Sequence, residues 1–294
     1  MHLIFTVRLE KQPKNLFIFF GIRPFFEEAF RTVAGCTSSR PGIQGHIACC
    51  QYHETFLQSL AGDSFAVRRH QKPSFPFIFQ PVILPNSANT NLTVELGLIL
   101  VGKAVHSIAV YLEVMQKMFA GELRQKAVAS VVKVESIGYR GERSIIYEPG
   151  RYFHPGTFQL LSLQGLTDGV ALLEDRVKVS IIAPVRIIVD GRHMREICFS
   201  SLLRSLFRRV SSMAFYFGGS ESGYDFKWLA KQSHLVEWEN AEFHWDEWEK
   251  GKGGMVGYGY VLGIMPEFQL FLLAGRYFNI GKGAAFGFGQ IKLN

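Results

Sequence analysis

Two short glycine-rich segments contain the residue types best suited to hold phosphate. Residues 251–259 read Gly-Lys-Gly-Gly-Met-Val-Gly-Tyr-Gly, and residues 281–289 read Gly-Lys-Gly-Ala-Ala-Phe-Gly-Phe-Gly. Glycine lets a backbone approach a ligand closely and exposes N–H donors, while lysine supplies positive charge. The alternative is a pair of glycine bulges that only bend strands. We expect a phosphate-binding surface formed by Lys252, Gly281, Lys282, Gly283, Gly287 and Gly289.

The spacing of these glycines excludes two common nucleotide-binding motifs. The interval from Gly275 to Lys282 differs by one residue from that of a P-loop, and no Ser or Thr follows the lysine. In the series that begins with Gly281 and Gly283, the third glycine, Gly287, comes one place late for a dinucleotide-binding fingerprint, and a strand is expected to follow the segment.

A second group of reactive side chains lies in the irregular, polar stretch of residues 36–74. A zinc site is one interpretation, because thiolates and imidazoles are the ligands that zinc prefers. Cys49 and Cys50 are adjacent, however, so their side chains point apart, unlike those of a Cys-x-x-Cys pair. We therefore expect no metal and no cofactor, although the stretch offers Cys36, His46, Cys49, Cys50 and His53.

Basic residues gather in two further places. Arg204 and Arg208 are four residues apart on one face of a predicted helix, and Arg209 lies at the edge of its apolar stripe. They would form a strip that contacts an RNA backbone, or a solvated helix face. The same alternatives apply to the second cluster, which is Arg68, Arg69, His70 and Lys72.

The tryptophans near residue 240 offer aromatic surface. Trp238, Trp245 and Trp248, with Phe243, would stack on unpaired bases. The alternation of aromatic and polar residues there is more typical of a strand that buries one face.

Composition limits the class of protein. The chain has 294 residues, 48% of them hydrophobic and 14% aromatic, which is enough for about two domains with packed cores. The formal charge of +7 suits a phosphate-bearing partner. The N-terminus lacks the pattern of an export signal, and the apolar run near residue 20 is interrupted by Arg23 and Pro24. We expect a cytoplasmic protein with reduced cysteines and no membrane segment.

Hydrophobic periodicity predicts the same order of elements twice. In the first half we expect strands at 2–9, 75–84, 91–102 and 128–137, with helices at 24–33 and 105–119. In the second half we expect strands at 176–189, 235–248, 254–264 and 286–293, with helices at 197–217 and 266–278. Residues 138–169 are interpreted as a connecting region.

Two β-α-β-β-α-β units predict an α+β fold of two tandem ferredoxin-like (RRM-like) domains, residues 1–150 and 151–294. Each sheet should be antiparallel with strand order 4-1-3-2. The two glycine-rich segments would then lie at the same end of the second sheet, with its first strand between them.

The C-terminal stretch Phe278-Asn279-Ile280-Gly281-Lys282-Gly283-Ala284-Ala285-Phe286-Gly287-Phe288-Gly289 resembles the glycine-rich signature of a CRISPR-associated family. This is the repeat-RNA-processing endoribonuclease family, Cas family six, of the RAMP superfamily. Further similarity lies in 253–257, in Ala183-Pro184-Val185-Arg186 and in the basic helix at 202–209. Residues 25–33, 36–52 and 76–79 also resemble parts of one subgroup, so the similarity spans most of the chain.

The resemblance implies that the protein binds and cuts CRISPR repeat RNA without a metal. In this chemistry a 2′-hydroxyl attacks the adjacent phosphate and leaves a 2′,3′-cyclic phosphate and a 5′-hydroxyl. In relatives the catalytic histidine commonly follows the first helix, which implies His46, then His53, as the base, with Tyr52 orienting the nucleophile and Arg40 or Lys72 on phosphate. Histidine suits this role because its pKa lies near neutrality.

One departure and two alternatives stay open. Residues 244–250 read His-Trp-Asp-Glu-Trp-Glu-Lys, a net acidic run where many relatives carry arginines. A non-catalytic crRNA-binding RAMP subunit, which would assemble with other Cas effector subunits, and a generic RRM-like RNA-binding protein are therefore the other hypotheses.

Overall fold

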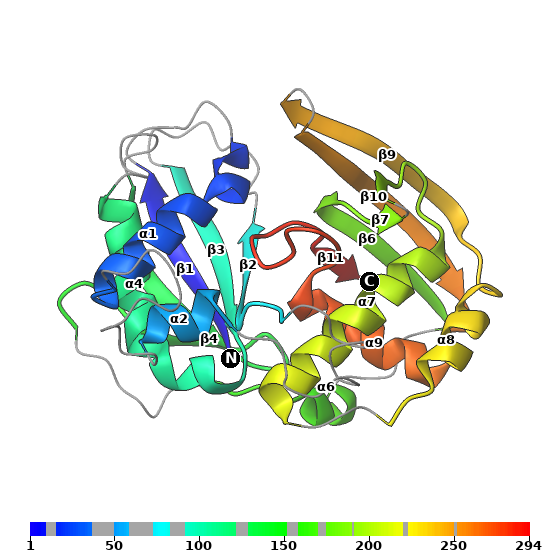
Figure 1. The fold of residues 1–294 in the computed structure, drawn as a ribbon, viewed down its shortest axis with the longest axis horizontal. Helices are drawn as coiled ribbons and strands as arrows, with labels where there is room; N and C mark the ends of the chain where they lie inside the picture. Colours follow the sequence, from blue (N-terminus) through cyan, green and yellow to red (C-terminus); the bar gives the residue numbers. More distant parts are fainter. Residues whose placement is uncertain are drawn as a thin grey trace. The chain divides into compact units, whose positions relative to one another are not determined.

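The computed structural model describes residues 1–9, 16–36, 50–58, 73–82, 92–121, 129–151, 158–169, 175–189, 191–219, 223–249 and 252–294. The chain divides into two compact units, Met1–Leu160 and Leu161–Asn294. The expected boundary near residue 150 precedes this division. Figure 1 shows the elements of each unit.

The first unit is built on a five-stranded antiparallel sheet with the order β2-β3-β1-β4-β5. Its strands are β1 (His2–Leu9), β2 (Phe77–Val82), β3 (Leu92–Leu100), β4 (Ala129–Ile137) and β5 (Arg143–Tyr147). Leu3, Phe5 and Val7 of β1 are buried, as expected for the central strand. The first four strands in this order form the ferredoxin-like arrangement, which confirms the predicted strand order.

Two helices cover one face of this sheet. They are α1 (Arg23–Val33) and α4 (Ile108–Ala120), which pack against each other; short 3-10 turns η1 (Leu16–Gly21) and η2 (Gly102–Ser107) precede them. Pro24 lies in the first turn of α1, where its missing N–H has no cost. The core between helices and sheet is mainly aromatic: the Phe26 ring lies 4.9 Å from Phe79 and 5.0 Å from Phe77.

The second unit repeats the topology with four strands in the order β11-β6-β10-β9, all antiparallel. They are β6 (Arg176–Val185), β9 (Glu239–Glu249), β10 (Lys252–Leu262) and β11 (Ile291–Leu293). In order of appearance this is 4-1-3-2, again as predicted. A short hairpin of β7 (Ile188–Val189) and β8 (Arg192–His193) follows β6.

Helices α7 (Phe199–Met213) and α9 (Pro266–Phe278) pack against each other beside this sheet, together with α6 (Leu163–Gly169) and α8 (Phe226–Ser233). The helix α7 continues as a π-helical turn, η4 (Ala214–Gly218). Its inward face is apolar as predicted, and the Phe207 ring lies 4.6 Å from Phe271 of α9.

Several elements differ from the sequence-based expectation. The stretch interpreted as irregular contains a helix, α2 (Gln51–Phe56), and the connecting region contributes β5 and α6. The helix α8 was not expected, although the side chain of Asp225 caps it by accepting bonds from the backbone of Lys227 and Trp228.

The last strand is much shorter than the predicted range of 286–293. Gly287 (φ 93°) and Gly289 (φ 69°) adopt positive φ, which an extended strand does not allow. Residues 282–289 therefore form turns, with one bridge residue at Phe286, and the regular strand begins only at Ile291.

Within the described part of the chain, no helix combines the length and apolar character needed to cross a lipid bilayer.

Candidate nucleic-acid interface and cysteine–histidine cluster

The glycine-rich segment of residues 281–289 folds as a compact turn against the end of β6. The Lys282 N–H donates to the Arg186 carbonyl (2.8 Å) and the Gly289 N–H donates to the Pro184 carbonyl (3.0 Å). Within the segment, the Phe286 N–H donates to the Gly283 carbonyl (2.8 Å). These three N–H groups are therefore engaged in the fold, whereas the side chain of Lys282 is exposed and can reach a phosphate.

Close packing explains the glycines at both ends of this segment. A Cβ at Gly281 (φ 78°) would overlap the Arg186 carbonyl oxygen, and one at Gly289 (φ 69°) would overlap the Ile280 carbonyl oxygen. Gly283 and Gly287 also have positive φ. These four glycines shape the turn, and their contact with RNA stays a prediction.

Arg186, at the end of β6, joins the two glycine-rich segments. Its Nε donates to the Gly253 carbonyl (2.7 Å), and its own carbonyl accepts from Lys282. Its guanidinium carbon lies 4.8 Å from the centre of the Phe288 ring and 5.1 Å from that of Trp248. No carboxylate among the described residues pairs with it, and partial burial lowers the pKa of Arg186. An arginine stacked on aromatic rings without a counter-charge suits a phosphate group or an unpaired base.

Arg186 was not among the expected RNA-binding residues. Its role depends on neighbours that only the fold brings close to it. Gly253, for example, is 67 residues away from Arg186 in the sequence. The available signal was the basic residue at the end of the strand Ala183-Pro184-Val185.

The first glycine-rich copy is part of a strand that begins two residues before its predicted start at residue 254. From Lys252 onward it belongs to β10, and Gly251 lies outside the described residues. The glycines here permit close packing: a Cβ at Gly254 would lie 2.8 Å from Pro184, and one at Gly259 would lie 2.7 Å from the Trp238 ring. The contacts of Arg186 with both segments support their placement at one end of the sheet. Only the backbone of Lys252 is described.

The arginines of α7 fall into two kinds. Arg204 and Arg208 are exposed on one face of the helix, as expected. Arg209 instead donates from Nε to the Phe278 carbonyl at the end of α9 (3.1 Å), and burial lowers its pKa to about 10. This placement favours a structural role for Arg209, and its contact with RNA stays a prediction.

The tryptophans of the second unit also differ from one another. Trp238 is half-buried just before β9; it donates to the Ile197 carbonyl (2.7 Å) and its ring packs 5.2 Å from Phe199, so it is held within the fold. Trp245 lies under the guanidinium of Arg195 at 3.6 Å. Together with the contact of Trp248 with Arg186, this gives two cation–aromatic pairs along β9.

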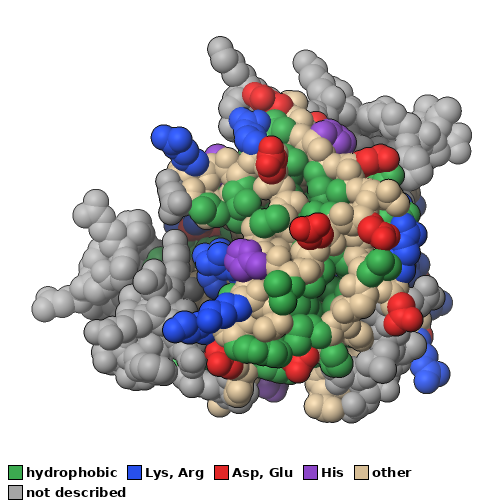
Figure 2. Space-filling view, turned by 90° about the vertical axis from the view of Figure 1, so that its right-hand side faces the viewer, with side chains coloured by type: hydrophobic (Ala, Val, Ile, Leu, Met, Phe, Trp, Pro, Cys, Tyr) green, Lys and Arg blue, Asp and Glu red, His purple; other side chains and the backbone are tan. Residues whose placement is uncertain are grey.

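In the view of Figure 2, acidic and apolar side chains are interspersed over the centre of the face. The basic side chains on this face form small separate groups. The formal charge of +7 is therefore not expressed here as one continuous basic surface.

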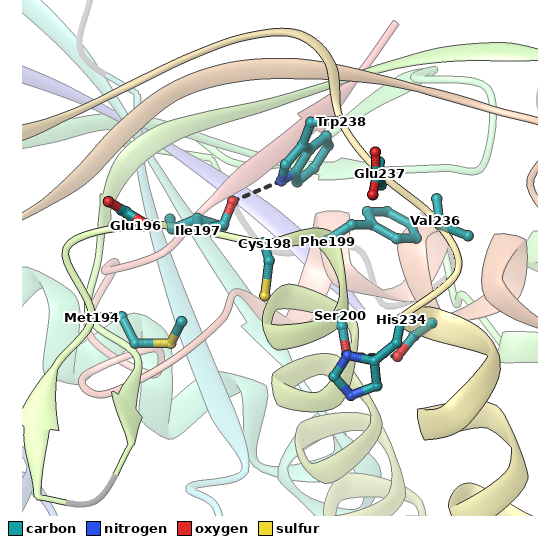
Figure 3. Close-up of a pocket in the computed structure, with 11 residues that line it drawn as sticks. Met194, Glu196, Ile197, Cys198, Phe199, Ser200, His234, Val236, Glu237 and Trp238 are labelled. Atoms are coloured by element: carbon teal, nitrogen blue, oxygen red, sulfur yellow. Dashed lines mark hydrogen bonds between the residues drawn. The ribbon is translucent and has the colours of Figure 1, made fainter.

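A cavity of about 470 Å³ lies beside the start of α7 (Figure 3). Cys198, His234, Glu196 and Glu237 are among its lining residues. The side chains of Ser200 and Ser233, which also line it, are hydrogen-bonded to each other at 2.8 Å. The two glutamates make the cavity unsuited to phosphate.

In the first unit, His53 lies on α2 and faces two cysteines. Its Nδ1 is 2.9 Å from the Cys50 Sγ and 4.0 Å from the Cys36 Sγ. The three ligand atoms lie within 4.8 Å of one another, and Cys36 is buried. This cluster concentrates acid–base and metal-binding groups at the end of α1.

Tyr52 lies next to this cluster but points into α1. Its hydroxyl accepts a bond from Arg31 (3.0 Å) and donates one to Glu27 (2.9 Å), and only 3% of the residue is exposed. Burial raises the pKa of Tyr52, and the bond from Arg31 opposes this shift. Tyr52 therefore positions α2 on α1, and its predicted role toward the nucleophile stays untested.

The remaining expected site residues lie outside the described residues. They are His46, Cys49, Arg40, Lys72, and the cluster of Arg68, Arg69 and His70.

Comparison with known families places these features in context. Residues 179–291 match the family model of the CRISPR-associated endoribonuclease Cas6, and residues 19–158 match a model described as an N-terminal domain. No curated protein sequence matches the chain.

Solved structures similar to the chain include two of Thermus thermophilus Cas6 (TTHB231). Its product complex is 14% identical with a TM-score of 0.56, and all of both chains is covered. A second structure of it is 16% identical with a TM-score of 0.50, covering 100% of this chain and 97% of that one. A partial Cas6-RT-Cas1–Cas2 complex is 14% identical with a TM-score of 0.59, covering all of this chain and 45% of that one. At these identities the similarity shows the shared fold. The second unit thus matches the Cas6 model over most of its length, and the fold of the whole chain is shared with Cas6 structures.

Proposed function

We propose that this protein binds CRISPR repeat RNA and cleaves it to crRNA without a catalytic metal, leaving a 2′,3′-cyclic phosphate. The match of residues 179–291 to the Cas6 endoribonuclease model supports a role in crRNA processing. The structural relatives include Cas6 in product and substrate-mimic complexes, which supports RNA as the ligand of this chain too.

The observation that carries the proposal is the arrangement around Arg186. It is a cation with no described carboxylate partner, stacked on Trp248 and Phe288, next to the exposed Lys282. Phosphate groups of the RNA would bind the positive charges, and unpaired bases would stack on the aromatic rings. Proteins that bind single-stranded nucleic acids use this combination of contacts. Arg204 and Arg208 would add backbone contacts from α7.

For the chemistry we propose His46 as the general base, with His53 as the second candidate. The base takes the proton of the 2′-hydroxyl while cations stabilise the charge that develops on the phosphorus oxygens. The Nδ1 of His53 already lies against the Cys50 thiol, which limits its use as a general base. Arg40 or Lys72 would supply the cation.

A binding-only role is the second candidate, and one observation favours it. The strand β9 carries Asp246 and Glu247 where the resemblance implies a basic run, which weakens one RNA contact. Such a protein would hold crRNA within a larger assembly, and one structural relative is solved with Cas1–Cas2.

The test is to incubate the full chain with repeat RNA and analyse the ends of the products. EDTA is added together with the RNA, so that free divalent ions are removed at the start of the reaction. We expect cleavage with 2′,3′-cyclic phosphate and 5′-hydroxyl ends. Retained RNA binding without cleavage would support the binding-only role instead.

A further inference from the structure

Three metal-binding side chains from two separate parts of the first unit converge at the end of α1. Cys36 follows α1, while Cys50 and His53 belong to the start of α2. The sulfur and nitrogen atoms lie within 4.8 Å of one another, although Cys36 and His53 are 17 residues apart in the chain. A convergence of two thiols and one imidazole is the donor set that zinc prefers.

Backbone structure fixes the position of each donor. The Cys36 N–H bonds to the Arg31 carbonyl (3.0 Å), and Gly35 has a positive φ of 61°, which together form a Schellman-type end to α1. Cys50 is the N-cap residue of α2, in extended conformation, so its side chain lies beside that of His53 in the first turn.

The core holds α2 in register with α1. The Phe56 ring lies 5.4 Å from Phe30 and 6.0 Å from Phe26, and the Tyr52 hydroxyl joins Arg31 and Glu27. The donors are therefore positioned by buried contacts on both sides of the cluster.

We propose that Cys36, Cys50 and His53 bind a zinc ion. With Zn–S distances of about 2.3 Å and a Zn–N distance of about 2.0 Å, tetrahedral ligands lie about 3.4–3.8 Å apart. The observed Nδ1–Sγ distances of 2.9 and 4.0 Å lie on either side of this range. Binding releases the two thiol protons, and the two thiolates neutralise the charge of the ion. A neutral site of this kind suits Cys36, which is only 7% exposed.

The adjacency of Cys49 and Cys50, which in the sequence alone is a reason against a metal site, does not exclude this zinc site. Adjacent cysteines diverge, but the group around Cys50 consists of Cys36 and His53, neither of which is adjacent to it in sequence. The described residues supply three ligands, which leaves the fourth tetrahedral position open to water.

The site has a consequence for the two histidines, although it does not depend on the proposed cleavage. A zinc-bound His53 cannot act as a general base through Nδ1. The zinc ion would have a structural role, holding the end of α1 to α2, and His46 would remain for acid–base chemistry.

The test measures metal content and not activity. The full chain, purified without metal-affinity chromatography, is analysed by elemental mass spectrometry, and we expect about one zinc per chain. Cys36→Ser and Cys50→Ser should lower this at least about tenfold, while Cys198→Ser, on the other unit, should leave it unchanged. His53→Cys should retain the ion, because a third thiolate replaces the imidazole.

A second measurement covers the case in which the serine variants do not fold. Wild-type protein from which zinc has been removed is titrated with Co²⁺, and we expect the near-ultraviolet charge-transfer band of thiolate–cobalt bonds. Wild-type protein that binds neither ion, or that contains a Cys36–Cys50 disulfide by peptide mass spectrometry, would overturn the proposal. Cleavage measured on the same preparations tests the proposed function separately.

Discussion

The two units share one topology but place their reactive residues differently. In the first unit the cysteine–histidine cluster lies between the first helix and the second strand, next to α2. In the second unit the cation–aromatic group lies at the end of the first strand, against the turn that precedes the last strand. The same scaffold thus supports a compact side-chain cluster in one case and a basic, aromatic surface in the other. Function here depends on the connections between elements.

The largest expected effect comes from the turn of the second unit. Gly289→Ala should lower the free energy of unfolding by about 3 kcal/mol, because the new Cβ overlaps the Ile280 carbonyl in a left-handed conformation. Gly191→Ala is the matched control: it has a similar φ of 76° but nothing within 4 Å, so it should cost only about 1 kcal/mol. Chemical denaturation measures both, and equal losses would show that the turn is not closely packed.

The lysines of the two glycine-rich segments test the binding surface. Lys252→Ala combined with Lys282→Ala should make the salt dependence of RNA affinity less steep by about 1.4 in the log–log slope, since two phosphate contacts are lost. Filter binding at several salt concentrations measures the slope. Lys227→Ala combined with Lys231→Ala removes two exposed lysines from α8 of the same unit and should leave the slope unchanged. Identical slopes for the two double variants would rule out a special role of the glycine-rich segments.

In the first unit, Tyr52→Phe should lower the free energy of unfolding by about 1–2 kcal/mol. The substitution removes a buried hydroxyl that links Arg31 and Glu27 and leaves their bonds unmade. Tyr147→Phe, on the edge strand β5, should change stability by less than about 0.5 kcal/mol. Urea denaturation distinguishes the two, and a negligible effect of Tyr52→Phe would contradict its positioning role.

The smallest effect concerns acid stability of the first unit. The hydrogen bond from Arg143 lowers the pKa of Glu95, so the stability that this carboxylate contributes is present above its unfolded-state value and is lost as pH falls. The contribution should stay below about 1 kcal/mol, because the pair is partly solvent-accessible. Glu95→Gln should therefore lose less stability than wild type between pH 6 and pH 3 in denaturation experiments. A parallel pH dependence of both proteins would show that the pair contributes nothing.

Much of the fold was predictable where local signals and tertiary structure agree. The strand His2–Leu9 coincides with its predicted range, because its apolar residues suit a buried central strand. The helix Pro266–Phe278 also coincides, since Pro266 marks its first turn. The predicted start of the last strand at residue 286 was wrong, because a hydrophobic pattern does not reveal the positive φ of Gly287 and Gly289.

The candidate sites were less predictable, for a physical reason. The helix α2 is only six residues long, and its position depends on the contacts of Tyr52 and Phe56 with α1. The importance of Arg186 comes from Gly253 and Phe288, which only the strand order brings together. Residue types indicate which chemistry is available, whereas long-range packing decides which residues share a site.

The most direct test of the division between the units compares His46→Ala with Arg186→Ala in RNA binding and single-turnover cleavage. We predict that His46→Ala slows cleavage at least about 100-fold and leaves RNA affinity nearly unchanged. Arg186→Ala should weaken RNA affinity about tenfold and retain near-normal cleavage at saturating RNA. If instead both substitutions change affinity and cleavage in the same proportion, RNA binding and cleavage are not divided between the second and the first unit.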